Sequence, residues 1–258
     1  MRSDVQFMFH ESSRSQPDDI LVPGWDREHR GPLRERTIVL PRTGQTFRIV
    51  QPADMDRLLD LAANDPEENL PYWAELWPSG IALADAVLLD PRRVHDTLVI
   101  ELGCGLGLTA AAALQAGARL LATDYDPAAL LLTRWNCRCN VGREPMVMQL
   151  NWRRPSAEFF ALVGSTGVPL VLAADVLYEQ RDIEPLLSLI DRILAPGGLL
   201  WLAEPGRQTA AVFVQRLLDR GWSDEIDQWT GPWPDSSDSK VTVSVHRLQR
   251  PHIPRPAG

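Results

Sequence analysis

Short apolar runs alternate with stretches suited to helices over most of the chain after residue 97. The runs predict five buried strands, at 98–102, 120–123, 146–150, 169–174 and 199–203. Helices are expected up to residue 116 and at about 127–140, 183–194 and 209–220. Strands that alternate with helices in this way favour an α/β fold with a doubly wound, mostly parallel sheet and right-handed crossovers.

The ends of these elements carry recognisable signals. Gly117 should end the first of these helices, and Asp126-Pro127 should begin the next one. The helix over 183–194 should end at Pro196-Gly197-Gly198. Two more strands, at 222–229 and 241–247, follow without a helix between them, so they should form an antiparallel C-terminal hairpin and complete a seven-stranded, Rossmann-like sheet.

The first part of the chain has a different pattern. Residues 1–35 are polar, show no periodicity, and should be loosely structured. A β-hairpin is expected at 37–50 and a short helix at 55–63. An aromatic, proline-containing loop at 71–80 then leads into a helix at 80–89, with Ser79 as its expected N-cap. We therefore divide the chain into an N-terminal extension (1–69), a main domain (70–250) and a tail (251–258).

Composition excludes several classes of protein. The 258 residues contain 26 basic and 34 acidic side chains, a net charge of −8, which makes a nucleic-acid or anionic-membrane partner a poor fit. No apolar run reaches the roughly 20 residues of a membrane-spanning helix, and the acidic first twenty residues do not resemble a signal peptide. Three cysteines and scattered histidines provide neither a disulfide framework nor a metal site, so we expect a reducing, cytoplasmic location.

The loop after the first strand is the strongest functional signal. Gly103, Gly105 and Gly107 let the backbone turn sharply at the strand's end and approach a ligand closely. Asp124 ends the next strand, where its carboxylate can accept hydrogen bonds from a ribose diol. The alternative is a tight turn followed by a helix-capping aspartate. The combined spacing favours a nucleoside-containing cofactor.

The details of the loop indicate which cofactor binds. Dinucleotide sites usually have the spacing G-x-G-x-x-G, whereas here it is G-x-G-x-G. Glu101 stands two residues before the first glycine, where its carboxylate would oppose a pyrophosphate but suits a cationic ligand. S-adenosylmethionine has a sulfonium, an amino group and a ribose diol, and it has no phosphate. A dinucleotide oxidoreductase is therefore the less favoured alternative.

The sequence resembles the class I, seven-strand S-adenosylmethionine-dependent methyltransferases. The resemblance covers about residues 70–250 and rests on the 101–107 loop, Asp124 and the 196–198 turn. Three further segments narrow it: Trp77 in a Leu-Trp-Pro-Ser loop, Asn151-Trp152 after the third strand, and the D-x-x-Y segment after the fourth. These segments are similar to the group that contains protein-lysine methyltransferases and bacterial relatives described as nicotinamide N-methylase-like.

The resemblance implies the cofactor-binding roles. The loop from Gly103 through Cys104, Gly105 and Gly107, next to Glu101, would hold the methionine portion, and Asp124 the ribose. Trp152 would flank the adenine, with Asn151 close to its edge, where many relatives carry aspartate instead. Ala174 would supply a backbone contact and Trp77 would cover the cofactor. For the two tryptophans, core or hinge packing is the alternative role.

Asp175 and Tyr178 are the expected catalytic residues. They follow the fourth strand and should orient an acceptor nitrogen; the alternative is that Asp175 caps the next segment while Tyr178 packs. The loop with Tyr72 and Trp73, with Glu75 at its mouth, would form the lid and acceptor wall. The expected activity is N-methylation of a protein lysine. A small-molecule, nicotinamide-like acceptor and a non-catalytic cofactor-binding protein are the alternatives.

Overall fold

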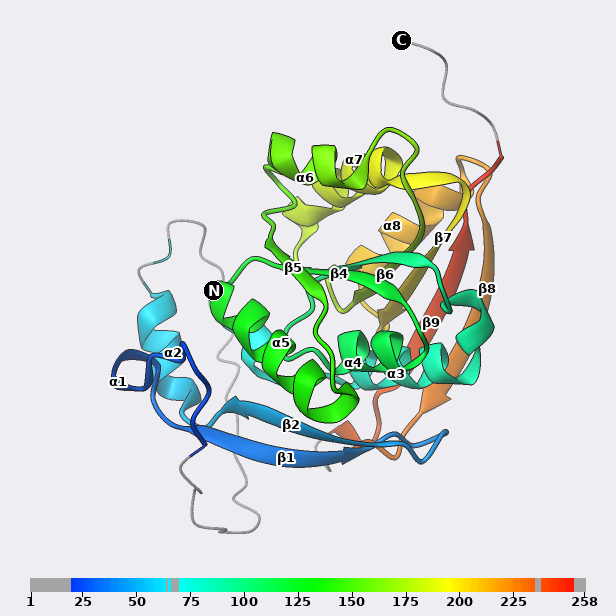
Figure 1. Ribbon diagram of the computed structural model, residues 1–258. Helices are drawn as coiled ribbons and strands as arrows, with labels where there is room; N and C mark the ends of the chain where they lie inside the picture. The colour runs from blue at the N-terminus through cyan, green and yellow to red at the C-terminus, as the bar shows by residue number, and fades with distance from the viewer. Residues whose placement is uncertain (1–19, 64, 66–69, 235–237, 253–258) are drawn as a thin grey trace, which may run out of the picture.

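The computed structural model describes residues 20–63, 65, 70–234 and 238–252, and its centre is a seven-stranded sheet of order β5-β4-β3-β6-β7-β9-β8 (Figure 1). The strands of this sheet are β3 (Leu98–Leu102), β4 (Arg119–Asp124), β5 (Met146–Gln149), β6 (Val168–Ala174), β7 (Leu194–Glu204), β8 (Ser223–Thr230) and β9 (Thr242–Gln249). The first five pair in parallel, and β9 runs antiparallel to both β7 and β8. The predicted α/β sheet with an antiparallel C-terminal hairpin is confirmed.

Helices cover both faces of the sheet (Figure 1). One layer contains α3 (Pro78–Leu89), α4 (Leu108–Gln115) and α5 (Pro127–Val141), and the other contains α6 (Ala157–Val163), α7 (Ile183–Ile193) and α8 (Gln208–Leu218). The shorter helices are α1 (Arg27–Arg30), α2 (Met55–Ala62), η1 (Tyr72–Ala74), η2 (Pro91–Arg93) and η3 (Gln180–Asp182). A separate cluster of buried apolar side chains lies on each face, which is the arrangement of a doubly wound fold.

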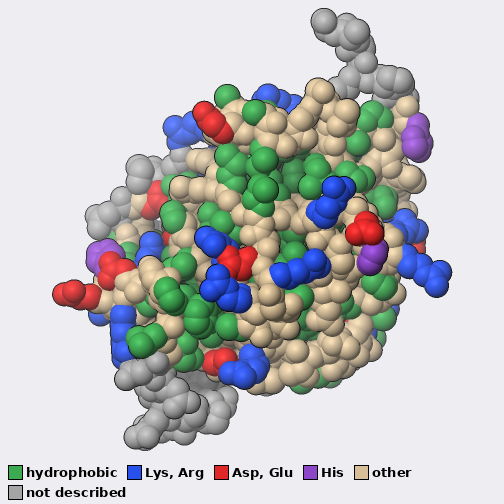
Figure 2. Space-filling model, viewed as in Figure 1, with side chains coloured by type: hydrophobic (Ala, Val, Ile, Leu, Met, Phe, Trp, Pro, Cys, Tyr) green, Lys and Arg blue, Asp and Glu red, His purple; other side chains and the backbone are tan. Residues whose placement is uncertain are grey.

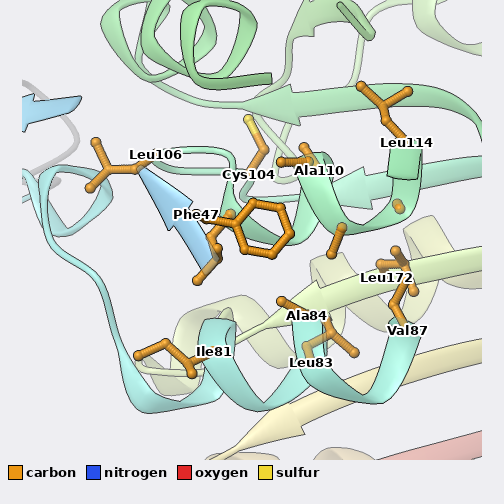
Figure 3. Packing of buried hydrophobic residues seen from close by; sticks show 14 of the residues in the cluster. Phe47, Ile81, Leu83, Ala84, Val87, Cys104, Leu106, Ala110, Leu114 and Leu172 are labelled. Atoms are coloured by element: carbon orange, nitrogen blue, oxygen red, sulfur yellow. The ribbon is translucent and has the colours of Figure 1, made fainter. Parts of the chain in front are cut away.

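The predicted N-terminal hairpin consists of β1 (Leu33–Val39) and β2 (Thr46–Pro52), paired antiparallel. Phe47 of β2 is 1% exposed and lies among the side chains of α3 and α4 (Figure 3). Asn136 of α5 binds the edge of β2 through both ends of its amide: its Oδ1 accepts from Val50 N at 2.8 Å and its Nδ2 donates to Val50 O at 2.9 Å. The hairpin therefore shares the core of the helical layer next to it.

Two predictions at the ends of elements were wrong. Helix α3 begins at Pro78 with Trp77 as its N-cap, and the buried Ser79 does not cap it, because proline takes the first helical position. Strand β7 begins at Leu194 and includes the expected turn at 196–198, because the backbone there pairs with the chain beyond β9: Arg250 N donates to Gly198 O at 2.9 Å.

Helix α6 lies between β5 and β6, where we expected no helix. It has only seven residues, and Ser156 caps it by accepting from Phe159 N at 3.2 Å. The segment expected to be loosely structured, 1–35, contains α1 and the start of β1, and its residues 1–19 lie outside the described residues. Most of the predicted tail, 253–258, also lies outside them.

On the face seen in Figure 2, acidic and basic side chains are interspersed, so the acidic excess is not concentrated there.

Candidate active site

The carboxyl ends of β3, β4 and β6 open into a cavity of about 450 Å³, the position at which doubly wound sheets bind ligands. The loop around η1 covers this cavity. All twelve residues that the sequence predicted for the site line it: Trp77, Glu101, Gly103, Cys104, Gly105, Gly107, Asp124, Asn151, Trp152, Ala174, Asp175 and Tyr178. The structure thus brings together segments that are up to 101 residues apart in the chain.

The glycine loop is built on backbone conformations that favour glycine. Gly105 and Gly107 have φ of +52° and +80°. A Cβ on Gly105 would lie 3.2 Å from the carbonyl oxygen of Trp73, and a Cβ on Gly107 only 2.7 Å from Thr133 Cα. Gly105 therefore passes directly beneath the covering segment, and Gly107 packs closely against α5.

Asp124 is fixed at the end of β4 by its own neighbours. Its Oδ2 accepts from Gly105 N at 2.9 Å and its Oδ1 from Asp126 N at 3.1 Å. Burial raises the pKa of this carboxyl to about 6, although the two backbone hydrogen bonds oppose the shift. The carboxylate is thus oriented toward the glycine loop before any ligand binds.

Glu101 is the unsatisfied group of the site. Its side chain is 3% exposed, and its Oε2 has no hydrogen-bond partner among the described residues. Burial, with the nearby Asp124 charge, raises the pKa of Glu101 well above its usual value. Buried polar groups normally have a partner, so a cationic ligand group that donates to Glu101 would complete this site.

Trp152 is held in place by Asp182, a residue that the sequence analysis missed. The fully buried Asp182 accepts from Trp152 Nε1 at 2.9 Å and from Arg153 Nε at 2.6 Å. It lies thirty residues after Trp152, in η3, so no local pattern connects the two. The indole is therefore fixed at its polar edge and can present a flat wall to the cavity.

Asp175 and Tyr178 belong to the segment after β6, and both line the cavity. Asp175 has a φ of +55°, uncommon for a residue other than glycine, and its Oδ1 accepts from Arg207 Nε at 2.5 Å. The ring of Tyr178 meets Tyr72 edge-on, with centroids 5.2 Å apart. Burial raises the pKa of Tyr178, so its hydroxyl stays neutral. Tyr72 in turn accepts, through its carbonyl oxygen, from Trp77 Nε1 at 2.9 Å.

The sequence analysis also missed Arg207. It follows β7, directly before α8, and it lines the cavity with its side chain 38% exposed. Because the carboxyl ends of neighbouring parallel strands lie at one edge of a sheet, a charged residue just after the fifth strand could have been considered alongside Asp175.

These features fit S-adenosylmethionine. The glycine loop leaves backbone exposed to the ligand, Asp124 can accept from ribose hydroxyls, and Glu101 can accept from the methionine amino group. Burial keeps Cys104 a thiol by raising its pKa, so it is a packing group in this loop rather than a nucleophile. Among the residues described, no three His, Cys, Asp or Glu side chains gather so as to hold a metal ion, and no helix is long and apolar enough to cross a membrane.

Comparisons with known proteins agree with this site. The model of the lysine methyltransferase family matches residues 60–219. An electron transfer flavoprotein beta subunit lysine methyltransferase from Xenopus laevis is 31% identical over 207 residues, which cover 76% of this chain and 78% of the relative. A mouse EEF1A lysine methyltransferase 3 is 28% identical over 189 residues, covering 72% and 75% of the two chains.

Solved structures support the same fold. Magnesium protoporphyrin IX methyltransferase from Synechocystis, crystallised with S-adenosylmethionine, matches with a TM-score of 0.52 at 14% identity, covering 75% of this chain and 96% of that one. This likeness concerns the fold alone. Together with the family match, it shows that the chain is an S-adenosylmethionine-dependent methyltransferase and belongs to the lysine methyltransferase family.

Proposed function

We propose that this enzyme transfers a methyl group from S-adenosylmethionine to the side-chain nitrogen of a lysine in a protein. Asp175 and Tyr178 act on the acceptor, and the ten other predicted residues bind the cofactor. The observation that carries the proposal is that Asp175 lines the same cavity as two tyrosines, Tyr72 and Tyr178, whose rings meet edge-on with centroids 5.2 Å apart. Aromatic rings suit the apolar stem of a lysine, and the carboxylate suits its nitrogen.

The bound cofactor supplies an activated methyl group: the acceptor's lone pair forms the new N–C bond, the C–S pair goes to sulfur, and the nitrogen then loses a proton to solvent. The chain's own residues position the acceptor nitrogen, which is the main protein contribution to such a displacement. Asp175 accepts from the nitrogen, and the neutral Tyr178 hydroxyl supplies a second polar contact. Enclosure by Tyr72 and Trp77 lowers the pKa of a lysine and so favours the free amine.

The acceptor that we propose to test first is an electron transfer flavoprotein, because relatives that carry this activity in their names align with most of the chain. The compartment we propose is the cytoplasm, since Cys104 and Cys137 are buried free thiols, a state that a reducing compartment maintains.

The experiment is incubation of the full chain with tritiated S-adenosylmethionine and an extract of the source organism, with purified electron transfer flavoprotein in a parallel reaction. We expect label in the protein fraction that survives acid hydrolysis as methylated lysine. Label confined to small molecules would replace the proposal with the small-molecule alternative. A reaction without the enzyme is the control for labelling that does not depend on the site.

A further inference from the structure

We propose that Arg207 is a positioning residue for the acceptor: it fixes the Asp175 carboxylate and its positive charge lowers the proton affinity of the bound amine. The inference rests on the proposed function, because it concerns an amine acceptor at Asp175. The juxtaposition that carries it is the ion pair between Arg207 Nε and Asp175 Oδ1, 2.5 Å long, inside the cavity wall.

Arg207 is held from two sides. Glu204, 7% exposed at the end of β7, accepts through Oε2 from Arg207 N at 2.8 Å and from Gly206 N at 2.6 Å. The backbone of Arg207 is thus anchored at the start of α8, while its side chain is anchored on Asp175. An arginine held at both ends keeps its place when an acceptor enters, so it is a fixed part of the site.

A carboxylate with no cation beside it would hold an acceptor lysine as an ammonium ion, which has no lone pair and cannot be methylated. Arg207 already balances the charge of Asp175 through Oδ1. The carboxylate still has a second oxygen, which can accept from the nitrogen and direct it. The neighbouring guanidinium is a like charge for an ammonium, so it shifts the acceptor toward the free amine.

Other ionisable groups also face this position. The segment after β6 contributes Tyr178 and Glu179, the covering loop contributes Tyr72 and Glu75, and Arg153 pairs with Glu179 at 3.7 Å. All of these residues line the cavity together with Asp175 and Arg207. Behind Arg207, Glu204 Oε1 lies 3.7 Å from His246 Nε2, and Asp224 Oδ2 lies 2.6 Å from His246 Nδ1. These two carboxylates outweigh the effect of burial and raise the pKa of His246 to about 9, so His246 stays mostly protonated up to about pH 8.

The test compares Arg207→Gln, which removes the charge, with Arg207→Lys, which keeps it. Labelling of the protein acceptor that the wild type labels in the extract is followed from pH 6 to 8.5 with tritiated S-adenosylmethionine at saturation. For Arg207→Gln we expect the midpoint of the pH–rate profile to move up by about one pH unit. Below that midpoint, the rate should therefore fall about tenfold. Arg207→Lys should keep the wild-type midpoint even if its rate is lower.

Two controls separate this role from a structural one. Arg216→Gln removes another arginine of α8, one that pairs with Glu184 on the surface, and should leave the profile unchanged. Affinity for S-adenosylhomocysteine, measured by calorimetry, should be the same in all variants. A rate lowered equally at every pH in Arg207→Gln, or an unchanged profile, would overturn the inference while leaving lysine methylation intact. If the wild type labels no protein, the proposed function and this inference fall together.

Discussion

Glu101→Gln should weaken cofactor binding and stabilise the free protein at the same time. The side chain is buried and its Oε2 has no hydrogen-bond partner among the described residues, so the ionised carboxylate destabilises the fold until a cation binds. Glutamine keeps the shape and removes the charge. Losing a hydrogen bond to a charged group costs about 1.5–3 kcal/mol, which predicts about 10- to 150-fold weaker binding of S-adenosylmethionine.

The gain in stability depends on pH. The pKa of Glu101 is raised above its value in the unfolded chain, so the wild type loses stability as pH rises from the unfolded pKa toward the folded one. Glutamine removes this loss. Removal of an uncompensated buried charge is worth about 1–3 kcal/mol, or about 2–12 °C in Tm for a protein of this size. The Tm of Glu101→Gln should therefore exceed that of the wild type, and this difference in Tm should be larger at pH 8 than at pH 5.

The assay is differential scanning calorimetry of the free protein combined with isothermal titration of the cofactor. Glu204→Gln is the matched control, since Glu204 is equally buried but accepts from two backbone N–H groups. It should lower Tm and leave cofactor affinity unchanged. If Glu101→Gln lowers Tm, or binds the cofactor as tightly as the wild type, then the carboxyl is not the unsatisfied cation acceptor that we infer.

Further predictions concern the ribose contact, the acceptor and the hairpin. Affinity for S-adenosylhomocysteine should fall as pH drops from 7.5 to 5.5, because the Asp124 carboxyl, with a pKa of about 6, takes up a proton; Asp124→Asn should flatten this dependence in calorimetry. Tyr178→Phe should reduce turnover about tenfold at saturating cofactor without changing cofactor affinity, and full activity would reduce Tyr178 to a packing residue. Asn136→Ala should lower the free energy of unfolding, measured in urea, by about 2–4 kcal/mol because it leaves Val50 N and O unpaired. Asn140 is only half-buried, so Asn140→Ala should lower this free energy by less, and equal losses would contradict the prediction.

The features that the sequence predicted best are those that depend on residues close together in the chain. The glycine loop and Asp124 were found because tight turns at strand ends need particular residue types at fixed spacings. Asp182 and Arg207 were missed because each meets its partner only after folding, across about thirty residues. Nothing in the local pattern marks Asp182 as the buried partner of Trp152, whereas the place of Arg207 just after the fifth strand was an available signal.

The errors in secondary structure have a similar origin. Strand β7 extends through a proline-glycine turn because Arg250 and Pro251, far along the chain, pair with it. Helix α6 is too short to show a clear hydrophobic period, and its capping Ser156 was the available signal. Tertiary pairing overrides local propensity in β7. The division of the chain at residues 69 and 250 stays a prediction, and the hairpin's shared core indicates that the extension is bound to the main domain.

The most direct test of the account is to locate the transferred methyl group. Full-length enzyme, S-adenosylmethionine and electron transfer flavoprotein from the source organism are incubated together, and tandem mass spectrometry maps every modified residue. The account predicts added methyl groups on lysine side chains, present with the wild type and strongly reduced with Tyr178→Phe. Methyl groups on another residue type, or none on the protein, would contradict it, whereas equal methylation of lysines by both enzymes would reduce Tyr178 to a packing residue.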